Sequence, residues 1–196
     1  MFIQIIQGSV TDPEALKRSI ARWQSEIKPG ATGYLGSTSG ITPDGRSITL
    51  VRFESEEAAQ ANSSRPEQSA WWGEASKAFG DDVTFHDCRD VDTAFGGGTD
   101  KAGFVQVIQG RTNNVAELRR AAIEMEDALH QERPDILGIV IAWHGDGSFT
   151  QAVYFESEDA ARAGEQTMAT SELGQKYGQL MDPDMTFFDL TDPEFD

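Results

Sequence analysis

The stretch VRFESEEAA at residues 51–59 returns as VYFESEDAA at residues 153–161, 102 positions later in the chain. In each copy Val and Phe alternate with a variable residue, which is the period of a half-buried β-strand. Ser55 and Ser157 are candidate helix N-caps, and the acidic pair that follows each of them lies in the first helical turn, where the helix dipole favours it. Each copy therefore predicts a junction between a strand and a helix, and the pair predicts a duplicated unit.

The repeat extends over nearly the whole chain, because residues 2–92 align with residues 104–194 at the same offset and without a gap. The pattern in each half predicts a strand, a helix, a two-stranded hairpin, a second helix and a last strand. The strands are expected at 2–8, 34–41, 46–53 and 83–88 in the first half, and at 104–110, 136–143, 148–155 and 185–190 in the second. Asp12 and Asn114 are the expected caps of the first helices.

This order, β-α-β-β-α-β, is that of ferredoxin-like folds. Its antiparallel sheet carries helices on one face, so the other face needs a cover, and the sheet of the second copy is the simplest one. The predicted fold is α+β, with two tandem ferredoxin-like repeats whose antiparallel sheets pack face to face as an intrachain α+β barrel. The repeats are expected at 1–92 and 103–196, joined by a Gly-rich linker at 93–102.

Composition narrows the class of protein. The formal charge of −17 over 196 residues argues against binding to nucleic acid or to an anionic membrane. One cysteine, Cys88, excludes an intrachain disulfide framework. The longest apolar run, 136–143, is too short to span a bilayer, and the N-terminus shows no targeting pattern. We expect a cytoplasmic protein that is either a monomer with a pseudo-dimeric barrel or a homodimer.

Three motifs resemble those of a known group. The first strand ends in Gln-Gly, the strand-to-helix junction reads Phe-Glu-Ser-Glu-x-Ala-Ala, and the second helix carries Trp71 and Trp72. The chain resembles the dimeric α+β barrel superfamily, and most closely its antibiotic-biosynthesis-monooxygenase (ABM) type, over both repeats. Relatives of this type include monooxygenases that form quinones without a metal or flavin, heme-degrading enzymes and lactone isomerases. The resemblance implies a site between the sheet and its helices or inside the barrel.

The candidate site residues lie on one face of the predicted sheets. Apolar residues at matching positions of the two repeats, such as Ile3 and Ile5, are expected to face the helices. The opposite face is then expected to carry Gln4, Arg52 and His86 in the first repeat and Gln106, Tyr154 and Phe188 in the second.

These residues suggest a pocket for a small apolar or aromatic molecule. Tyr154 and Phe188 would form an aromatic wall. His86 would remove a phenolic proton, since imidazole titrates near neutral pH, and Arg52 would stabilise the resulting oxyanion. In the simpler alternative, His86 is an ordinary, partly exposed strand residue and the two glutamines bond to each other.

Trp23 and Trp72 are expected to play different roles. Trp23 lies on the apolar stripe of the first helix and is expected in the core. Trp72 lies off the stripe of the second helix, so it is a candidate to line the mouth of a pocket or to contact another chain.

The sequence predicts neither a metal nor a cofactor. Its three histidines are dispersed, and it has no phosphate loop and no Gly-x-Gly-x-x-Gly motif. Heme-degrading relatives need a histidine on the second helix, and neither repeat has one. The leading hypothesis is a cofactor-independent monooxygenase-like protein acting on a small aromatic or polyketide-like compound. The alternatives are a non-catalytic module for small-ligand binding or assembly, and an isomerase or lyase on the same fold.

Overall fold

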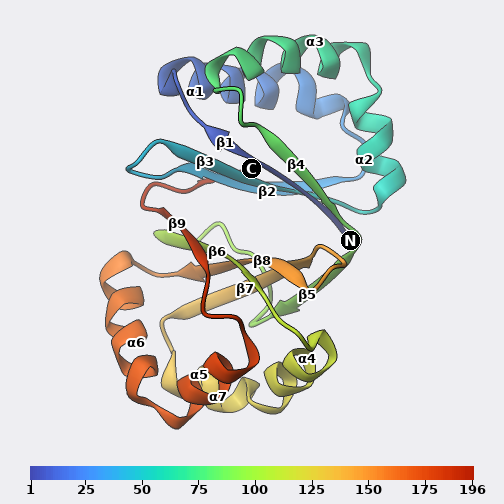
Figure 1. The fold of residues 1–196 in the computed structure, drawn as a ribbon. Helices are drawn as coiled ribbons and strands as arrows, with labels where there is room; N and C mark the ends of the chain where they lie inside the picture. The colour runs from blue at the N-terminus through green and yellow to red at the C-terminus, as the bar shows by residue number, and fades with distance from the viewer. The chain divides into compact units, whose positions relative to one another are not determined.

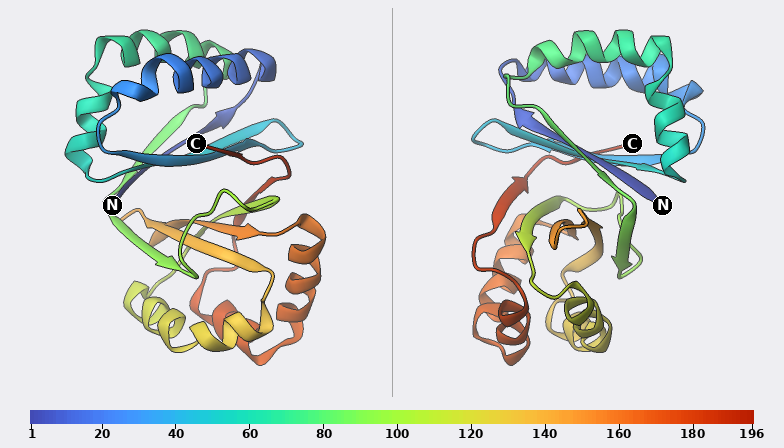
Figure 2. Two further views of the ribbon diagram at one scale, coloured as in Figure 1. Left: turned by 180° about the vertical axis from the view of Figure 1, so that it is seen from behind. Right: turned by 45° about the vertical axis from the view of Figure 1, so that its right-hand side comes forward.

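The computed structural model describes residues 1–196 and divides the α+β chain into two compact units (Figure 1). Unit 1 consists of Met1–Arg89 and Glu194–Asp196, and unit 2 consists of Asp90–Pro193. Each unit holds a five-stranded antiparallel sheet, and helices cover one face of that sheet (Figure 2). The prediction of two tandem ferredoxin-like repeats in an α+β fold is confirmed.

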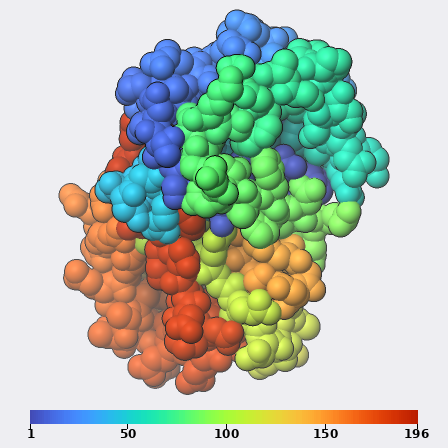
Figure 3. All heavy atoms as spheres, turned by 45° about the horizontal axis from the view of Figure 1, so that its top comes forward, coloured from blue at the N-terminus to red at the C-terminus, as the bar shows by residue number.

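Unit 1 has the sheet order β10-β2-β3-β1-β4. Its strands are β1 (Phe2–Ser9), β2 (Tyr34–Ile41), β3 (Arg46–Phe53), β4 (Thr84–Cys88) and β10 (Glu194–Phe195). Its helices are α1 (Pro13–Arg22), α2 (Glu56–Ser63) and α3 (Pro66–Ala75), with a π-helical turn at Trp23–Ile27 and 3₁₀ turns at Lys28–Gly30 and Ser76–Ala78. Figure 3 shows α1 and α3 side by side on the outside of this unit.

Unit 2 has the equivalent order β5-β7-β8-β6-β9. Its strands are β5 (Asp90–Ala94), β6 (Phe104–Arg111), β7 (Ile136–Trp143), β8 (Ser148–Phe155) and β9 (Thr186–Leu190). Its helices are α4 (Val115–Glu124), α5 (Glu126–Glu132), α6 (Glu158–Thr170) and α7 (Glu172–Leu180). The four hairpin strands of the two units begin and end at the predicted residues.

The repeated motif owes its form to capping and packing. Ser55 Oγ accepts a hydrogen bond from the backbone N–H of Ala58 at 3.2 Å, and Ser157 caps α6 in the same way. Phe53 and Ala59, both from the motif, form a buried cluster with Phe2. Burying a phenylalanine side chain contributes about 1.5–3 kcal/mol. The motif therefore fixes the helix against the sheet. Its second copy places α6 against the sheet of unit 2 with the same N-cap.

The fifth strand of each sheet comes from the other half of the sequence. β5 lies at the end of the first repeat and pairs with β7, whereas β10 lies at the end of the second repeat and pairs with β2. The expected linker at 93–102 therefore begins inside a strand, because Thr93 and Ala94 form ladder pairs with Val140 and Ile139. Strand pairing also shifts the bounds of the units from those of the repeats.

No helix of the chain has the length and apolar content needed to cross a membrane.

Candidate functional site

Strand register decides which side chains of unit 1 face the helices. Gln4 lies opposite Val51 in the β1–β3 pair, whereas Ile3 lies opposite Arg52. Directly paired residues share a face of the sheet, so Gln4 shares a face with Val51 and Ile3 shares the other with Arg52. The predicted grouping of Gln4 with Arg52 and His86 is therefore wrong. Alternation could not reveal the error, because β1 has apolar residues on both faces.

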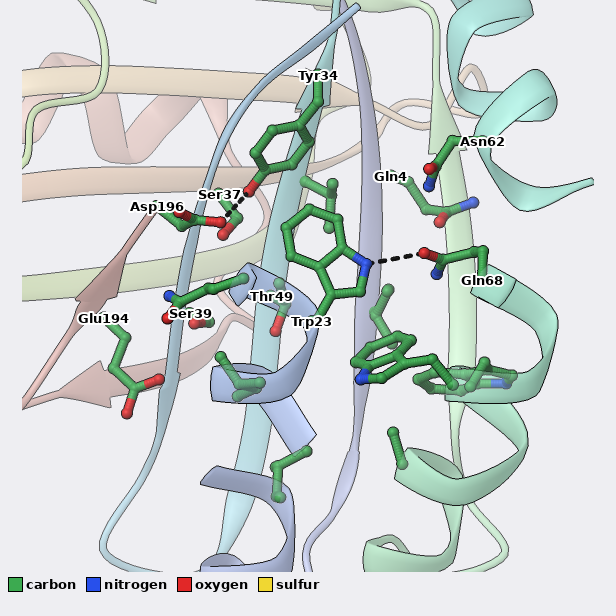
Figure 4. Close-up of a pocket in the computed structure, with 18 of the residues that line it drawn as sticks. Gln4, Trp23, Tyr34, Ser37, Ser39, Thr49, Asn62, Gln68, Glu194 and Asp196 are labelled. Atoms are coloured by element: carbon green, nitrogen blue, oxygen red, sulfur yellow. Dashed lines mark hydrogen bonds between the residues drawn. The ribbon is translucent and has the colours of Figure 1, made fainter. Parts of the chain in front are cut away.

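The helix face of unit 1 holds a cavity of about 120 Å³ (Figure 4). It lies between the sheet and the layer formed by α1, the π-helical turn and α3. The aromatic side chains that line it are Trp23, Tyr34, Phe53, Trp71, Trp72, Phe79 and Phe195. The site thus lies at one of the two places that the resemblance to ABM-type proteins implies, between a sheet and its helices.

Trp23 is held in the wall of this cavity by a change in helix geometry. α1 ends at Arg22, and the chain continues as a π-helical turn that begins at Trp23. The indole N–H of Trp23 donates to Gln68 Oε1 at 2.8 Å, and its ring meets that of Tyr34 edge-on with centroids 4.9 Å apart (Figure 4). Trp23 is half-buried and packs against Tyr34 and Trp71, so it belongs to the layer between sheet and helices and also lines the cavity. π-Helical turns are frequent at functional sites.

Helix α3 supplies the other two tryptophans. Trp71 Nε1 donates to the backbone carbonyl of Ser19 at 2.8 Å, which ties α3 to α1. Trp72 lines the cavity and packs against Phe79 and Phe85, with ring centroids 6.1 and 5.2 Å away. Phe85 is 47% exposed, so this aromatic group extends from the cavity to the surface.

The polar end of the cavity is built around Tyr34. Its hydroxyl donates to Asp196 Oδ2 at 3.2 Å (Figure 4). Lys28 forms an ion pair with the other carboxylate oxygen of Asp196. Burial, together with the nearby charge of Asp196, raises the pKa of Tyr34 well above its usual range. Tyr34 therefore keeps its proton at any ordinary pH.

Asp196 can lie beside Tyr34 because residue 36 is a glycine. β2 has an irregularity between Tyr34 and Gly36, and Gly36 has φ +128°. A Cβ at residue 36 would lie 2.5 Å from the backbone oxygen of Asp196. The close approach lets Asp196 exchange backbone hydrogen bonds with Ser37, at 2.8 and 3.3 Å. Only a residue without a side chain fits both the φ and the contact.

Arg52 and His86 do not line this cavity. His86 pairs with Ile5 and so lies, like Arg52, on the sheet face away from the helices. Arg52 Nε is buried and has no hydrogen-bond partner. Cys88, on the same face, is 1% exposed, and burial raises the pKa of its thiol to about 11. The catalytic roles assigned to Arg52 and His86 stay predictions.

In unit 2 the residue equivalent to Gln4 belongs to a salt-bridge network. Gln106 donates to Glu165 Oε1 and Asp189 Oδ1, each at 3.0 Å. Arg162 bridges the same two carboxylates, and the ion pairs raise the pKa of its guanidinium against the opposing effect of burial. Gln4 has a simpler partner, since it donates to Asp87 Oδ1 at 2.9 Å. Both glutamines thus bond to acidic groups within their own units.

The two units also differ at the position of the polar end. By the repeat offset, Tyr34 and Asp196 correspond to Ile136 and Ala94. These two residues pack in or against an apolar cluster of unit 2. Tyr154 and Phe188, the predicted aromatic wall, are 1% and 5% exposed and pair with Val105 and Val107 on the sheet face that carries no helices. The fold therefore does not require the Tyr34–Asp196 pair.

No group of three or more His, Cys, Asp or Glu side chains is arranged to hold a metal ion.

Comparison with known proteins supports the fold. No protein-family model matches the chain, and no curated protein matches it. A structure of a proposed monooxygenase from Fusobacterium nucleatum superposes with TM-score 0.72 at 8% identity, covering 96% of this chain and 90% of that one. One from Lactobacillus acidophilus gives TM-score 0.69 at 11% identity, with 96% and 92% covered. An anthrone oxidase-like protein gives TM-score 0.63 at 11% identity, with 99% and 93% covered.

The chain has the tandem α+β fold of these monooxygenase-like proteins, over nearly the full length of each. The predicted α+β fold of two tandem repeats is thus shared with these proteins. Identities this low carry no residue of a neighbour's site over to this chain.

Proposed function

We propose that unit 1 binds a small aromatic or polyketide-like compound in the cavity beside Trp23 and oxidises it with O₂, as a cofactor-independent monooxygenase. The observation that carries the proposal is a cavity walled by three tryptophans and closed at one end by the Tyr34–Asp196 pair. Apolar cavities with a few convergent polar groups are the usual form of small-molecule sites.

The size of the cavity limits the ligand. An apolar cavity of about 150 Å³ accommodates benzene, so a cavity of about 120 Å³ has room for no more than a single ring. Further rings of a polyketide-like compound would extend past Trp72 toward exposed Phe85. The aromatic walls suit a flat ring, since edge-on and offset contacts between rings add about 0.5–1.5 kcal/mol each.

The reaction class can be written for a phenol without any bound group. The O–H bond and the para C–H bond of the ring break, a new C=O bond forms from one oxygen atom of O₂, and the other atom leaves as water. Phenol and O₂ thus give quinone and water. The side chains of the cavity would orient the ring, accept its hydroxyl hydrogen bond and exclude bulk water from the electron-rich intermediate.

Oxygen uptake tests the proposal. We would measure O₂ consumption and quinone absorbance with anthrone and with substituted phenols, and ligand binding by quenching of tryptophan fluorescence. The active-site variant is Trp23→Leu, and the matched control is Met125→Leu, the same repeat position in unit 2. Saturable uptake that is lost in W23L and kept in M125L is expected.

Two other outcomes would change the assignment. Binding that is sensitive to W23L but produces no oxidation would favour the non-catalytic ligand-binding module. Neither binding nor uptake with any ring compound would overturn the proposal.

A further inference from the structure

The charges around the cavity are of one sign. The charged residues that line the cavity are Glu194 and Asp196, both acidic. Both come from the segment that β10 adds to the sheet of unit 1. Lys28 neutralises Asp196 but is not itself a lining residue. The other polar lining groups are neutral amides and hydroxyls.

The hydrogen bonds fix what the polar end offers to a ligand. The Tyr34 hydroxyl donates its hydrogen to Asp196 and also hydrogen-bonds with the Ser37 side chain, so its oxygen keeps one acceptor position for a ligand. Burial keeps that phenol protonated, as its raised pKa indicates. Each oxygen of Asp196 has one recorded partner, Lys28 on Oδ1 and Tyr34 on Oδ2, and a carboxylate oxygen can accept two hydrogen bonds. This end of the cavity therefore presents acceptors.

We propose that the unit 1 cavity selects its ligand by a hydroxyl hydrogen: a neutral phenol donates to the Tyr34–Asp196 pair, whereas the matching anion and the matching compound without a hydroxyl are rejected. This inference rests on the proposed function and names the substrate class of the same site.

An anion, a ring without a hydroxyl group and a cation are each expected to bind less favourably than the neutral phenol, for different physical reasons. An anionic ring would meet the carboxylate of Glu194, and that of Asp196 only partly offset by Lys28, in a partly desolvated site where repulsion between like charges is poorly screened. A ring without a hydroxyl hydrogen leaves the acceptors without a donor, and a site built to bond a hydroxyl discriminates strongly against analogues that lack it. A cationic ligand gains less electrostatic attraction than two free carboxylates would provide, because Lys28 already forms an ion pair with Asp196.

The selection also favours release of the product. Oxidation to the quinone replaces the phenolic O–H by C=O, so the product has lost the hydrogen by which the substrate was held. Product affinity falls below substrate affinity at the moment the reaction is complete. The second unit cannot select in this way, since Ile136 and Ala94 stand at the equivalent positions.

A matched ligand series tests the proposal under anaerobic conditions, which prevent turnover. The series is 4-methoxyphenol, 1,4-dimethoxybenzene, 4-methoxybenzoate and 4-methoxybenzylamine, with each Kd measured by calorimetry on the full-length protein. We expect the phenol to bind about tenfold more tightly than the dimethoxy compound, the value of one net hydrogen bond, and the benzoate to bind more weakly still.

Substitutions test whether Tyr34 and Asp196 cause the preference for the phenol. Tyr34→Phe and Asp196→Asn should each bring the phenol and the dimethoxy compound to within about threefold of each other. Glu124→Gln, which removes an exposed carboxylate that does not line the cavity, should leave the ratio unchanged. Circular dichroism and denaturant midpoints confirm that the variants are folded.

The outcomes separate this inference from the proposed function. Equal affinity for the phenol and the dimethoxy compound, or tighter binding of the benzoate or the amine, overturns the selection while leaving an aromatic site in place. A donor preference that persists in both Y34F and D196N also overturns it. If none of the four compounds binds, both proposals fall.

Discussion

Tyr34 donates its phenolic hydrogen bond to Asp196 Oδ2 across 3.2 Å, between residues 162 positions apart in the sequence. The contact exists because β10 lies at the end of the second repeat yet pairs with β2 in the sheet of unit 1. The polar end of the cavity is therefore assembled from residues of both repeats. A repeat considered by itself contains neither the pair nor the reason for it.

The raised pKa of Tyr34 predicts a loss of stability at high pH. The unfolded chain releases the tyrosine proton near pH 10, whereas the folded chain retains it. Above that pH the unfolded state binds fewer protons than the folded state, so the free energy of unfolding falls as the pH rises. Below pH 10 this contribution is fully present.

Urea unfolding at pH 8 and at pH 11 measures the effect. Lysine deprotonation affects every variant, so the relevant quantity is the difference between the wild type and Tyr34→Phe. We expect the wild type to lose more stability between the two pH values than Y34F does. An equal loss would show that Tyr34 ionises in the folded protein as freely as in the unfolded chain.

Substitutions on the two faces of the sheet test where the ligand binds. His86 pairs with Ile5 on the face away from the helices, whereas Gln4 lines the cavity. We expect His86→Ala to leave the Kd of 4-methoxyphenol within about twofold, and Gln4→Leu to change it by about fivefold or more because it alters the cavity wall. Calorimetry reports both. If H86A abolishes binding and Q4L does not, the ligand lies on the face that the sequence pattern first suggested.

Some of this structure could be predicted from sequence for clear physical reasons. The hairpin strands begin and end where predicted because alternation and the Asp-Gly turns give local signals, and Gly45 and Gly147 have the positive φ values that such turns need. Ser55 and Asp12 cap their helices as expected, since a cap is also a local hydrogen bond.

The candidate site was harder to predict because its determinants are not local. The face of β1 depends on register, which alternation cannot supply when both faces are apolar. The position of Trp23 depends on a π-helical turn with no distinctive sequence signal. Asp196 reaches Tyr34 through a two-residue strand. The repeat offers little help here: residues 92–94 and 194–196 align at the repeat offset, but only Asp92 and Glu194 are chemically alike, so the pattern does not show that both segments join a fifth strand.

Cys88 is predicted to be unreactive in the folded protein. Its side chain is 1% exposed, and burial raises the pKa of the thiol to about 11. At pH 8 about one thiol in a thousand would then be ionised, compared with about one in four for a free cysteine. We expect a chromogenic disulfide reagent to react with Cys88 at least a hundredfold faster in 6 M guanidinium than in buffer. Similar rates in the two conditions would show that β4 opens readily.

Removing one partner of the Arg133–Asp135 ion pair should destabilise the protein strongly. The pair is nearly buried, with side chains 7% and 11% exposed, and it is bidentate, with Arg133 Nε 2.9 Å from Asp135 Oδ1 and Nη2 2.7 Å from Oδ2. The guanidinium also stacks over Phe155 at 5.4 Å. Asp135→Asn leaves a buried positive charge without its counter-ion, which typically costs about 3–5 kcal/mol.

The matched control is Glu26→Gln, which breaks an exposed ion pair with Arg22. The side chains of that pair are 44% and 61% exposed, so its loss should cost less than about 1 kcal/mol. Urea unfolding followed by circular dichroism measures both. A loss below about 1 kcal/mol for D135N would mean that water or a rearranged side chain replaces Asp135 at the guanidinium, and that the burial of this pair contributes little to the stability of unit 2.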